Sequence, residues 1–113
     1  MAQFMFLRRG DDDATRDYTP EQAQQVIQRY VDWARKLRGE GRYHGGDELK
    51  PGGATVRSRG GQPVIDGPYP EAKEAIGGYF LVEAADLADA GRIATECPVL
   101  DHGGCVEVRE ISG

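Results

Sequence analysis

The sequence predicts an α+β protein of the ferredoxin-like class, with the order βαββαβ and an added hairpin. Two amphipathic helical segments alternate with apolar segments rich in strand-favouring residues, and a Gly-Gly pair separates two short extended segments between them. Because the chain has 113 residues, we expect a single domain, 1–113, built around one core.

The first strand and the first helix carry the clearest local signals. Segment 3–7 is dense in residues that favour strands. Thr19 can cap a helix, Pro20 suits its first position, and Gln22 completes a capping box. Gly39 and Gly41 then end the helix. Its apolar stripe, including two aromatic residues expected in the core, is Ala23, Val26, Ile27, Tyr30, Trp33, Ala34 and Leu37.

Turn signals divide the rest of the chain. Segment 43–49 is extended but interrupted by two glycines, and segments 54–59 and 62–65 flank Gly60-Gly61, a strong hairpin signal. Residues 77–84 form the clearest strand, and residues 104–111 form the last one. Between them, Asp86 caps a second helix that Pro98 ends. The predicted buried stripe of this helix is Leu87, Ala90, Ala94 and Cys97.

Alternation along three of these strands assigns their side chains to two faces of a sheet. The apolar face should lie under the helices and consists of Phe4, Phe6, Phe80, Val82, Val106 and Val108. The other face, here called the mixed face, consists of Met5, Leu7, Tyr79, Leu81, Glu83, Cys105, Glu107, Arg109 and Ile111. A monomer would expose the apolar members of the mixed face together, so we expect a homodimer whose sheets pack through it. Its charged members either form a cross-strand salt bridge, Glu83 or Glu107 with Arg109, or contact a ligand.

Composition excludes several classes of protein. The net charge of −5 and the scattered basic residues argue against nucleic-acid binding. The apolar stretch 4–7 is too short for a signal peptide, and no run approaches a membrane span, so we expect no membrane association and a cytoplasmic location. Cys97 and Cys105 lack metal-site spacing and are expected to be free thiols. We expect neither a metal nor a cofactor, because no dinucleotide-binding or nucleophile-elbow motif occurs.

Several stretches together resemble the YCII-related proteins of the DGPF subgroup. They are His-Gly-Gly-Asp-Glu-Leu at 44–49, Thr-Val-Arg at 55–57, Asp-Gly-Pro-Tyr-Pro-Glu-Ala-Lys-Glu at 66–74, Gly-Gly-Tyr-Phe-Leu-Val at 77–82, Ala-Asp-Leu at 85–87 and Gly-Cys-Val-Glu-Val-Arg at 104–109. The resemblance covers essentially the whole chain, with Tyr69 where the subgroup usually has phenylalanine.

The resemblance implies a dimeric α+β barrel, usually a homodimer, with a site in the cleft of each subunit. It also implies two kinds of relative, namely proteins associated with extracytoplasmic-function sigma factors and a dehydrochlorinase of a chlorinated hydroxyquinol. YCII proteins proper carry an early histidine paired with an aspartate. This chain has no histidine before His44, so that pair cannot be transferred to it.

The candidate catalytic residues are Asp66 and His44. Asp66 either caps the Asp-Gly-Pro turn or acts as a general base or ligand anchor. His44 precedes two glycines and would form an acid–base dyad with Asp66 if strand pairing brings the two together. His102, in the loop before the last strand, is expected to be exposed.

The candidate ligand-binding residues are Tyr69, Arg57, Tyr79 and Lys73. Tyr69 either packs over the cleft or anchors its loop, and Lys73 and Arg57 either bind an anionic ligand or are solvated charges. Tyr79 lies on the mixed face, beside any cleft there.

The function expected from these observations is binding of an unknown small molecule by a homodimer. The first alternative is a cofactor-independent lyase or isomerase that uses acid–base chemistry. The second is a regulatory protein associated with an extracytoplasmic-function sigma factor.

Overall fold

The computed structural model describes residues 1–10, 17–50, 52–66 and 76–113. In chain order the elements are β1 (Ala2–Arg9), α1 (Pro20–Gly39), β2 (Tyr43–Glu48), β3 (Thr55–Arg59), β4 (Gln62–Asp66), β5 (Ile76–Ala84), α2 (Leu87–Ala94), the 3-10 helix η2 (Pro98–His102) and β6 (Cys105–Glu110). The predicted α+β order, including the added hairpin, is confirmed.

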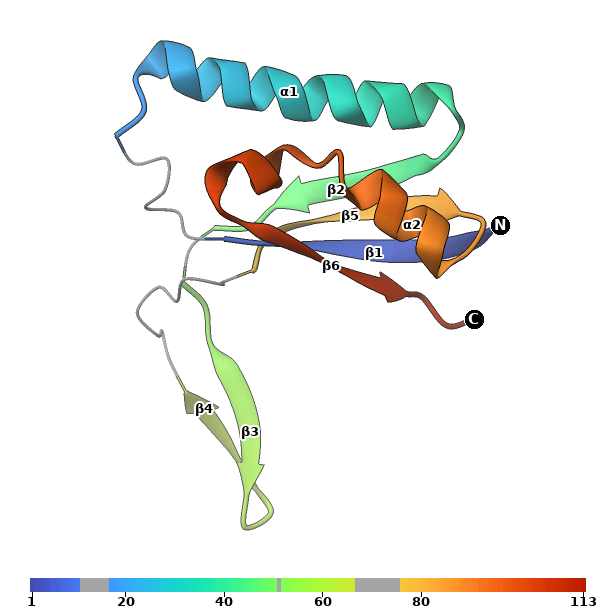
Figure 1. The fold of residues 1–113 in the computed structure, drawn as a ribbon. Coiled ribbons are helices and arrows are strands. Elements are labelled where there is room, and N and C mark those ends of the chain that lie inside the picture. The colour runs from blue at the N-terminus through green and yellow to red at the C-terminus, as the bar shows by residue number, and fades with distance from the viewer. Residues whose placement is uncertain (11–16, 51, 67–75) are drawn as a thin grey trace.

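One four-stranded antiparallel sheet and one hairpin contain the strands. The sheet has the order β2-β5-β1-β6, and β3 pairs only with β4. Both helices lie on the same face of the sheet, while the β3–β4 hairpin projects away from the opposite side (Figure 1). The ferredoxin-like class is therefore correct, because β1 and β2 flank β5 and are joined by the crossover helix α1.

The apolar face of the sheet forms the core, as predicted. Phe4, Phe6 and Val82 are fully buried. The Trp33 ring of α1 lies 6.3 Å from the Phe6 ring and 5.1 Å from the Phe80 ring, centroid to centroid. Trp33 is thus the core residue that the helical stripe predicted.

Helix α1 begins as its sequence predicts. The Thr19 hydroxyl accepts a hydrogen bond from the Gln22 backbone N–H at 3.1 Å, and the Gln22 side chain accepts one from the Thr19 N–H at 2.9 Å. Only part of the stripe reaches the core, because Trp33 and Leu37 are buried whereas Ile27 remains 54% exposed. The N-terminal half of α1 therefore presents apolar side chains to a space beside the core.

Helix α2 differs from the prediction at both ends. Leu87 is the first residue of the helix and is 59% exposed, so its assignment to the buried stripe was wrong. Burial starts one turn later, at Ala90, and continues at Ile93 and Ala94. The helix ends at Ala94 rather than at Pro98. Pro98 instead begins η2, since a proline at the first helical position gives up no helical hydrogen bond.

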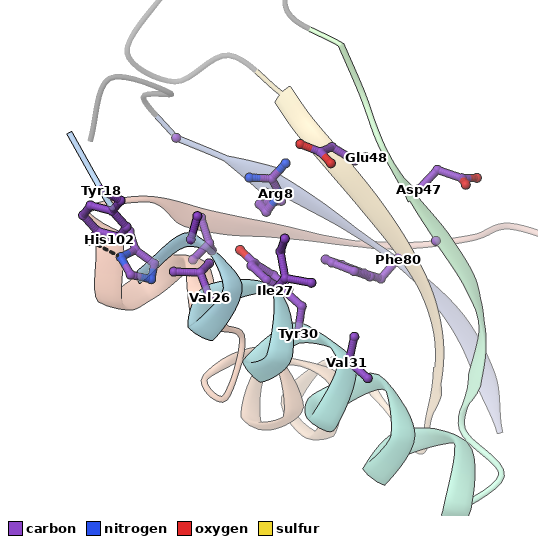
Figure 2. A pocket seen from close by; sticks show the side chains of 14 residues that line it. Arg8, Tyr18, Val26, Ile27, Tyr30, Val31, Asp47, Glu48, Phe80 and His102 are labelled. Carbon is purple, nitrogen blue, oxygen red and sulfur yellow. Dashed lines mark hydrogen bonds between the residues drawn. The ribbon is translucent and has the colours of Figure 1, made fainter. Parts of the chain in front are cut away.

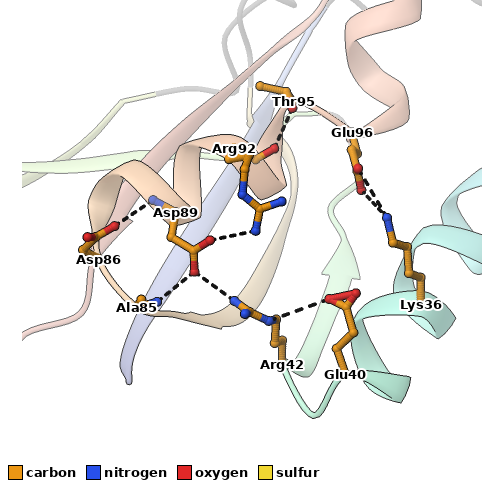
Figure 3. Close-up of polar contacts among 9 residues, drawn as sticks. All are labelled: Lys36, Glu40, Arg42, Ala85, Asp86, Asp89, Arg92, Thr95 and Glu96. Carbon is orange, nitrogen blue, oxygen red and sulfur yellow. Dashed lines mark hydrogen bonds and ion pairs between the residues drawn. The ribbon is translucent and has the colours of Figure 1, made fainter.

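Asp89 joins α2 to the end of the α1–β2 connection. Its carboxylate accepts hydrogen bonds from the Ala85 backbone N–H at 2.9 Å, from Arg92 at 2.7 Å and from Arg42 at 2.9 Å (Figure 3). The hydrogen bond from Ala85, followed by those from the two guanidinium groups, holds the pKa of Asp89 well below its usual range.

Replacing Asp89 with asparagine is expected to lower the free energy of unfolding at neutral pH. A carboxyl whose pKa is depressed by folding stabilises the protein above its unfolded pKa of about 4, and this stabilisation is lost as pH falls. The difference between wild type and D89N should therefore shrink in urea titrations from pH 7 to pH 3. D32N is the control, because Asp32 only accepts a bond from Gln28 on the exposed side of α1. A difference that stays constant with pH would contradict the prediction.

Neither α1 nor α2 covers the mixed face of the sheet, and no other helix of the described residues does so (Figure 1). Met5, Leu7 and Leu81 on the two central strands are half-buried rather than exposed, and Ile111 is 38% exposed. Arg109 is not paired across strands as one alternative predicted: Glu107 contacts Arg9 of β1 at 3.0 Å and Arg109 of its own strand at 3.4 Å. The Glu107–Arg109 pair lies along β6 rather than across strands. Apolar side chains thus occupy the centre of this face and charged pairs its edges.

Candidate functional site

A cavity of about 480 Å³ lies between the N-terminal half of α1 and the sheet (Figure 2). We call it the α1 pocket. Its apolar wall is formed by Val26, Ile27 and Val31 of α1 together with Phe80 of β5. The polar side chains that line it are Arg8, Tyr18, Tyr30, Asp47, Glu48 and His102. A mostly apolar cavity with a few convergent polar groups is the usual form of a small-molecule site.

Tyr30 marks the boundary between the core and the α1 pocket. Its ring stacks on that of Phe80 with 6.1 Å between centroids and 18° between planes. Burial raises the pKa of Tyr30 to about 12. The hydroxyl is consequently protonated at neutral pH and can donate a hydrogen bond. The sequence predicted Tyr30 as a core residue, and its half-buried ring does pack against the core while also lining the pocket.

Arg8 continues the apolar face of β1 beyond Phe6 and reaches the pocket. It donates a hydrogen bond to the Gly77 carbonyl, and its guanidinium carbon lies 5.9 Å from the centroid of the Tyr30 ring. A Cβ atom added to Gly77 would lie only 2.8 Å from a terminal nitrogen of Arg8. The glycine at this position therefore makes room for the guanidinium.

Tyr18 and His102 form a polar pair at the pocket. The Tyr18 hydroxyl lies 2.8 Å from His102 Nδ1, and His102 Nε2 is buried without a hydrogen-bond partner among the described residues (Figure 2). The expectation that His102 is an exposed loop residue was wrong. It closes η2, and Val99 in the same turn is buried in the core, which draws the imidazole inward.

The predicted catalytic residues lie elsewhere and have other partners. Asp66 ends β4, and its carboxylate pairs with Arg57 at 3.1 Å and with Arg59 at 3.5 Å. His44 lies on the mixed side of β2, where its Nε2 is 2.8 Å from Glu83. The structure thus brings Asp66 together with Arg57, a predicted ligand-binding residue, and brings His44 to a different carboxylate.

The remaining predicted ligand-binding residues are only partly visible. The Tyr79 hydroxyl donates a hydrogen bond of 2.7 Å to Asp47 on the mixed face, and this bond is the main cause that raises the pKa of Tyr79. Tyr69 and Lys73 lie outside the described residues, as does most of the Asp-Gly-Pro-Tyr segment.

Sequence reasoning missed Arg8, Tyr18 and His102 as site residues. Arg8 could have been recognised as a candidate from the sequence, because strand alternation places it on the same face as Phe4 and Phe6. A charged side chain on an otherwise apolar face is either paired or functional. Tyr18 and His102 are separated by more than eighty positions, and no sequence pattern joins them.

The described part of the chain contains no group of three or more His, Cys, Asp or Glu side chains arranged to hold a metal ion. It also contains no helix that is long and apolar enough to cross a membrane.

Comparison with known proteins identifies the family. The YCII-related domain matches residues 2–113. No curated protein matches the sequence. Among solved structures, the fold is similar to that of 5-chloro-2-hydroxyhydroquinone dehydrochlorinase from Burkholderia phenoliruptrix AC1100, solved in complex with 2,5-dihydroxybenzoquinone. The TM-score is 0.54 at 12% sequence identity, and the alignment covers 97% of this chain and 93% of the other. The chain therefore belongs to the YCII-related domain family.

Proposed function

We propose that this protein binds a small, partly apolar molecule in the α1 pocket. The observation that carries the proposal is the cavity of about 480 Å³ in which an apolar wall faces several polar side chains. Tyr30 offers a hydroxyl donor, Arg8 a positive charge, and His102 a buried ring nitrogen with no partner among the described residues. The dehydrochlorinase with a similar fold was solved with a planar, oxygenated ring, which makes such compounds the first probes.

A tryptophan at position 27 is expected to block this site. Ile27 lines the pocket and is 54% exposed, so I27W should fill the cavity with little loss of stability. We expect I27W to weaken binding by about tenfold or more, as for the loss of a well-packed apolar contact surface. The measurement is an NMR titration of the labelled protein with 2,5-dihydroxybenzoquinone and a set of small aromatic acids, amides and phenols.

The matched control is V56W. Val56 is 65% exposed on the β3–β4 hairpin and does not line the pocket. It should bind every compound as wild type does. Absence of binding to wild type across the set, or equal binding by I27W, would overturn the proposed function.

A second candidate function is proton transfer in the same pocket, as in a cofactor-independent lyase or isomerase. The Tyr18–His102 hydrogen bond favours it. If Nδ1 accepts the hydrogen bond from the Tyr18 hydroxyl, Nε2 carries the ring proton and can donate a hydrogen bond; with the other tautomer, Nε2 has a free lone pair and can act as a base. In each arrangement Nε2 has no hydrogen-bond partner among the described residues, and His102 lines the pocket.

We also infer that the protein is a homodimer that associates through the mixed face. Met5, Leu7 and Leu81 form an apolar centre on the two middle strands, and ion pairs surround it, which is the usual layout of an interface. The match to one family over residues 2–113 supports a single domain. The DGPF subgroup, the cytoplasmic location and a link to a sigma factor stay predictions from sequence.

A further inference from the structure

Arg8 is a half-buried cation whose charge is not balanced in the described structure. Its guanidinium lies beside the α1 pocket, and within residues 1–10, 17–50, 52–66 and 76–113 it forms no ion pair with a carboxylate. Its guanidinium donates a hydrogen bond to the Gly77 carbonyl, lies over the Tyr30 ring and also interacts with the Tyr30 hydroxyl. A guanidinium has five N–H donors, so these contacts leave donors free.

The other arginines on the sheet show how unusual this is. Arg9, the next residue, points to the mixed face and contacts Glu107 at 3.0 Å. Arg42, at the start of β2, contacts Asp89 at 2.9 Å. Both pair with carboxylates of the chain, whereas Arg8 lines the α1 pocket.

The two described acidic side chains that line the α1 pocket form no ion pair with Arg8. Asp47 belongs to the pocket lining, but its carboxylate accepts the hydrogen bond from Tyr79 on the opposite face of the sheet. Figure 2 shows the Asp47 side chain directed away from Arg8. Glu48 lies at the rim and is exposed to solvent. Water screens its charge more strongly than it screens a charge inside the pocket.

The position of Arg8 is fixed by its neighbours. Cβ atoms on Gly77 and Gly78 would lie 2.8 Å and 3.1 Å from guanidinium nitrogens, so the planar group rests on bare backbone. Tyr30 covers its other side at 5.9 Å. A guanidinium held in this way is preorganised, which reduces the entropy lost when it binds a planar oxyanion.

We propose that Arg8 and Tyr30 form an oxyanion-binding site in the α1 pocket, and that the ligand carries a carboxylate or a similarly compact planar anion. This inference rests on the proposed function, because it names the chemical class of molecule that the pocket takes. The guanidinium supplies charge-assisted hydrogen bonds and the Tyr30 hydroxyl a neutral one. The apolar body of the ligand lies against Ile27 and Val31.

Matched acids and amides test the proposal. The probes are benzoate, 4-hydroxybenzoate, phenylacetate and cinnamate, each compared with its carboxamide in NMR titrations at low and high salt. We expect wild type to bind the acids about tenfold or more tightly than the amides, the size expected for a charge-assisted hydrogen bond. R8Q should lose this preference and keep its affinity for the amides. Y30F should retain the preference but bind the acids several-fold more weakly.

R9Q is the matched control, because it removes the same charge from the next residue on the opposite face. It should keep the preference for acids. The comparison of acids with amides on wild type needs no variant, so it tests the preference for an oxyanion even if R8Q fails to fold. If wild type binds the acids and the amides equally and I27W binds neither, the results support binding in the α1 pocket and contradict the oxyanion site. The oxyanion site is also wrong if R8Q weakens both series equally. If neither series binds, the proposed function itself fails and the oxyanion site with it.

Discussion

Replacing Leu81 with arginine is expected to convert the proposed homodimer into a folded monomer. Leu81 lies opposite Met5 in the register of β5 and β1, at the centre of the mixed face. A charge buried there without a partner would cost several kcal/mol, about enough to shift a micromolar dimer to monomer. The fold should survive, because the core lies on the other face of the sheet. Sedimentation or light scattering gives the mass, and circular dichroism reports the fold.

L87R is the control for the dimer prediction. Leu87 is 59% exposed on α2, on the helical side of the sheet, so the same substitution there should leave the mass unchanged. A wild-type mass of one chain at tens of micromolar would overturn the homodimer. A folded L81R dimer would place the interface elsewhere.

Removing the His102 imidazole is expected to abolish proton transfer in the α1 pocket. If the protein catalyses such a reaction, H102A should slow it by about 10²- to 10⁴-fold, the usual contribution of a general acid or base. The assay follows exchange of C–H protons by NMR in D₂O for a panel of enolisable cyclic ketones and hydroxyquinones.

The chain contains its own control, because it has only two histidines. His44 pairs with Glu83 on the mixed face, so H44A should exchange protons at the wild-type rate. Y18F removes the hydroxyl beside Nδ1 and should slow proton exchange more than it weakens binding of the compound. If wild type exchanges protons with none of the compounds, the proton-transfer function is contradicted and small-molecule binding remains as the proposed function. Loss of exchange in H44A would instead support the site predicted from sequence.

Local sequence signals were sufficient for most of the fold. The capping box at Thr19, the Gly60-Gly61 turn and the two-residue alternation of Phe4 and Phe6 each depend on near neighbours in the chain. Such signals report backbone geometry and the direction of a side chain, so the element order and the apolar face followed from them. The misassigned Leu87 shows their limit, because periodicity marks a helical stripe but not the turn at which burial begins.

The candidate site depended on contacts between distant parts of the chain. Asp66 and His44 are chemically suitable residues in a family-like pattern, yet their observed partners are Arg57 and Glu83. Tyr18 meets His102 only because α1 and η2 both pack on the same face of the sheet.

The sequence by itself therefore determined the element order, the capped helix α1, and the division of the sheet into an apolar face and a mixed face. Only the tertiary structure decided which polar residues share a cavity. The physical reason is that strand alternation and helical periodicity are local properties, whereas the α1 pocket arises where the stripe of α1 extends beyond the core. In that region Ile27 lines the pocket together with Arg8, whose guanidinium lies against Gly77 and Gly78.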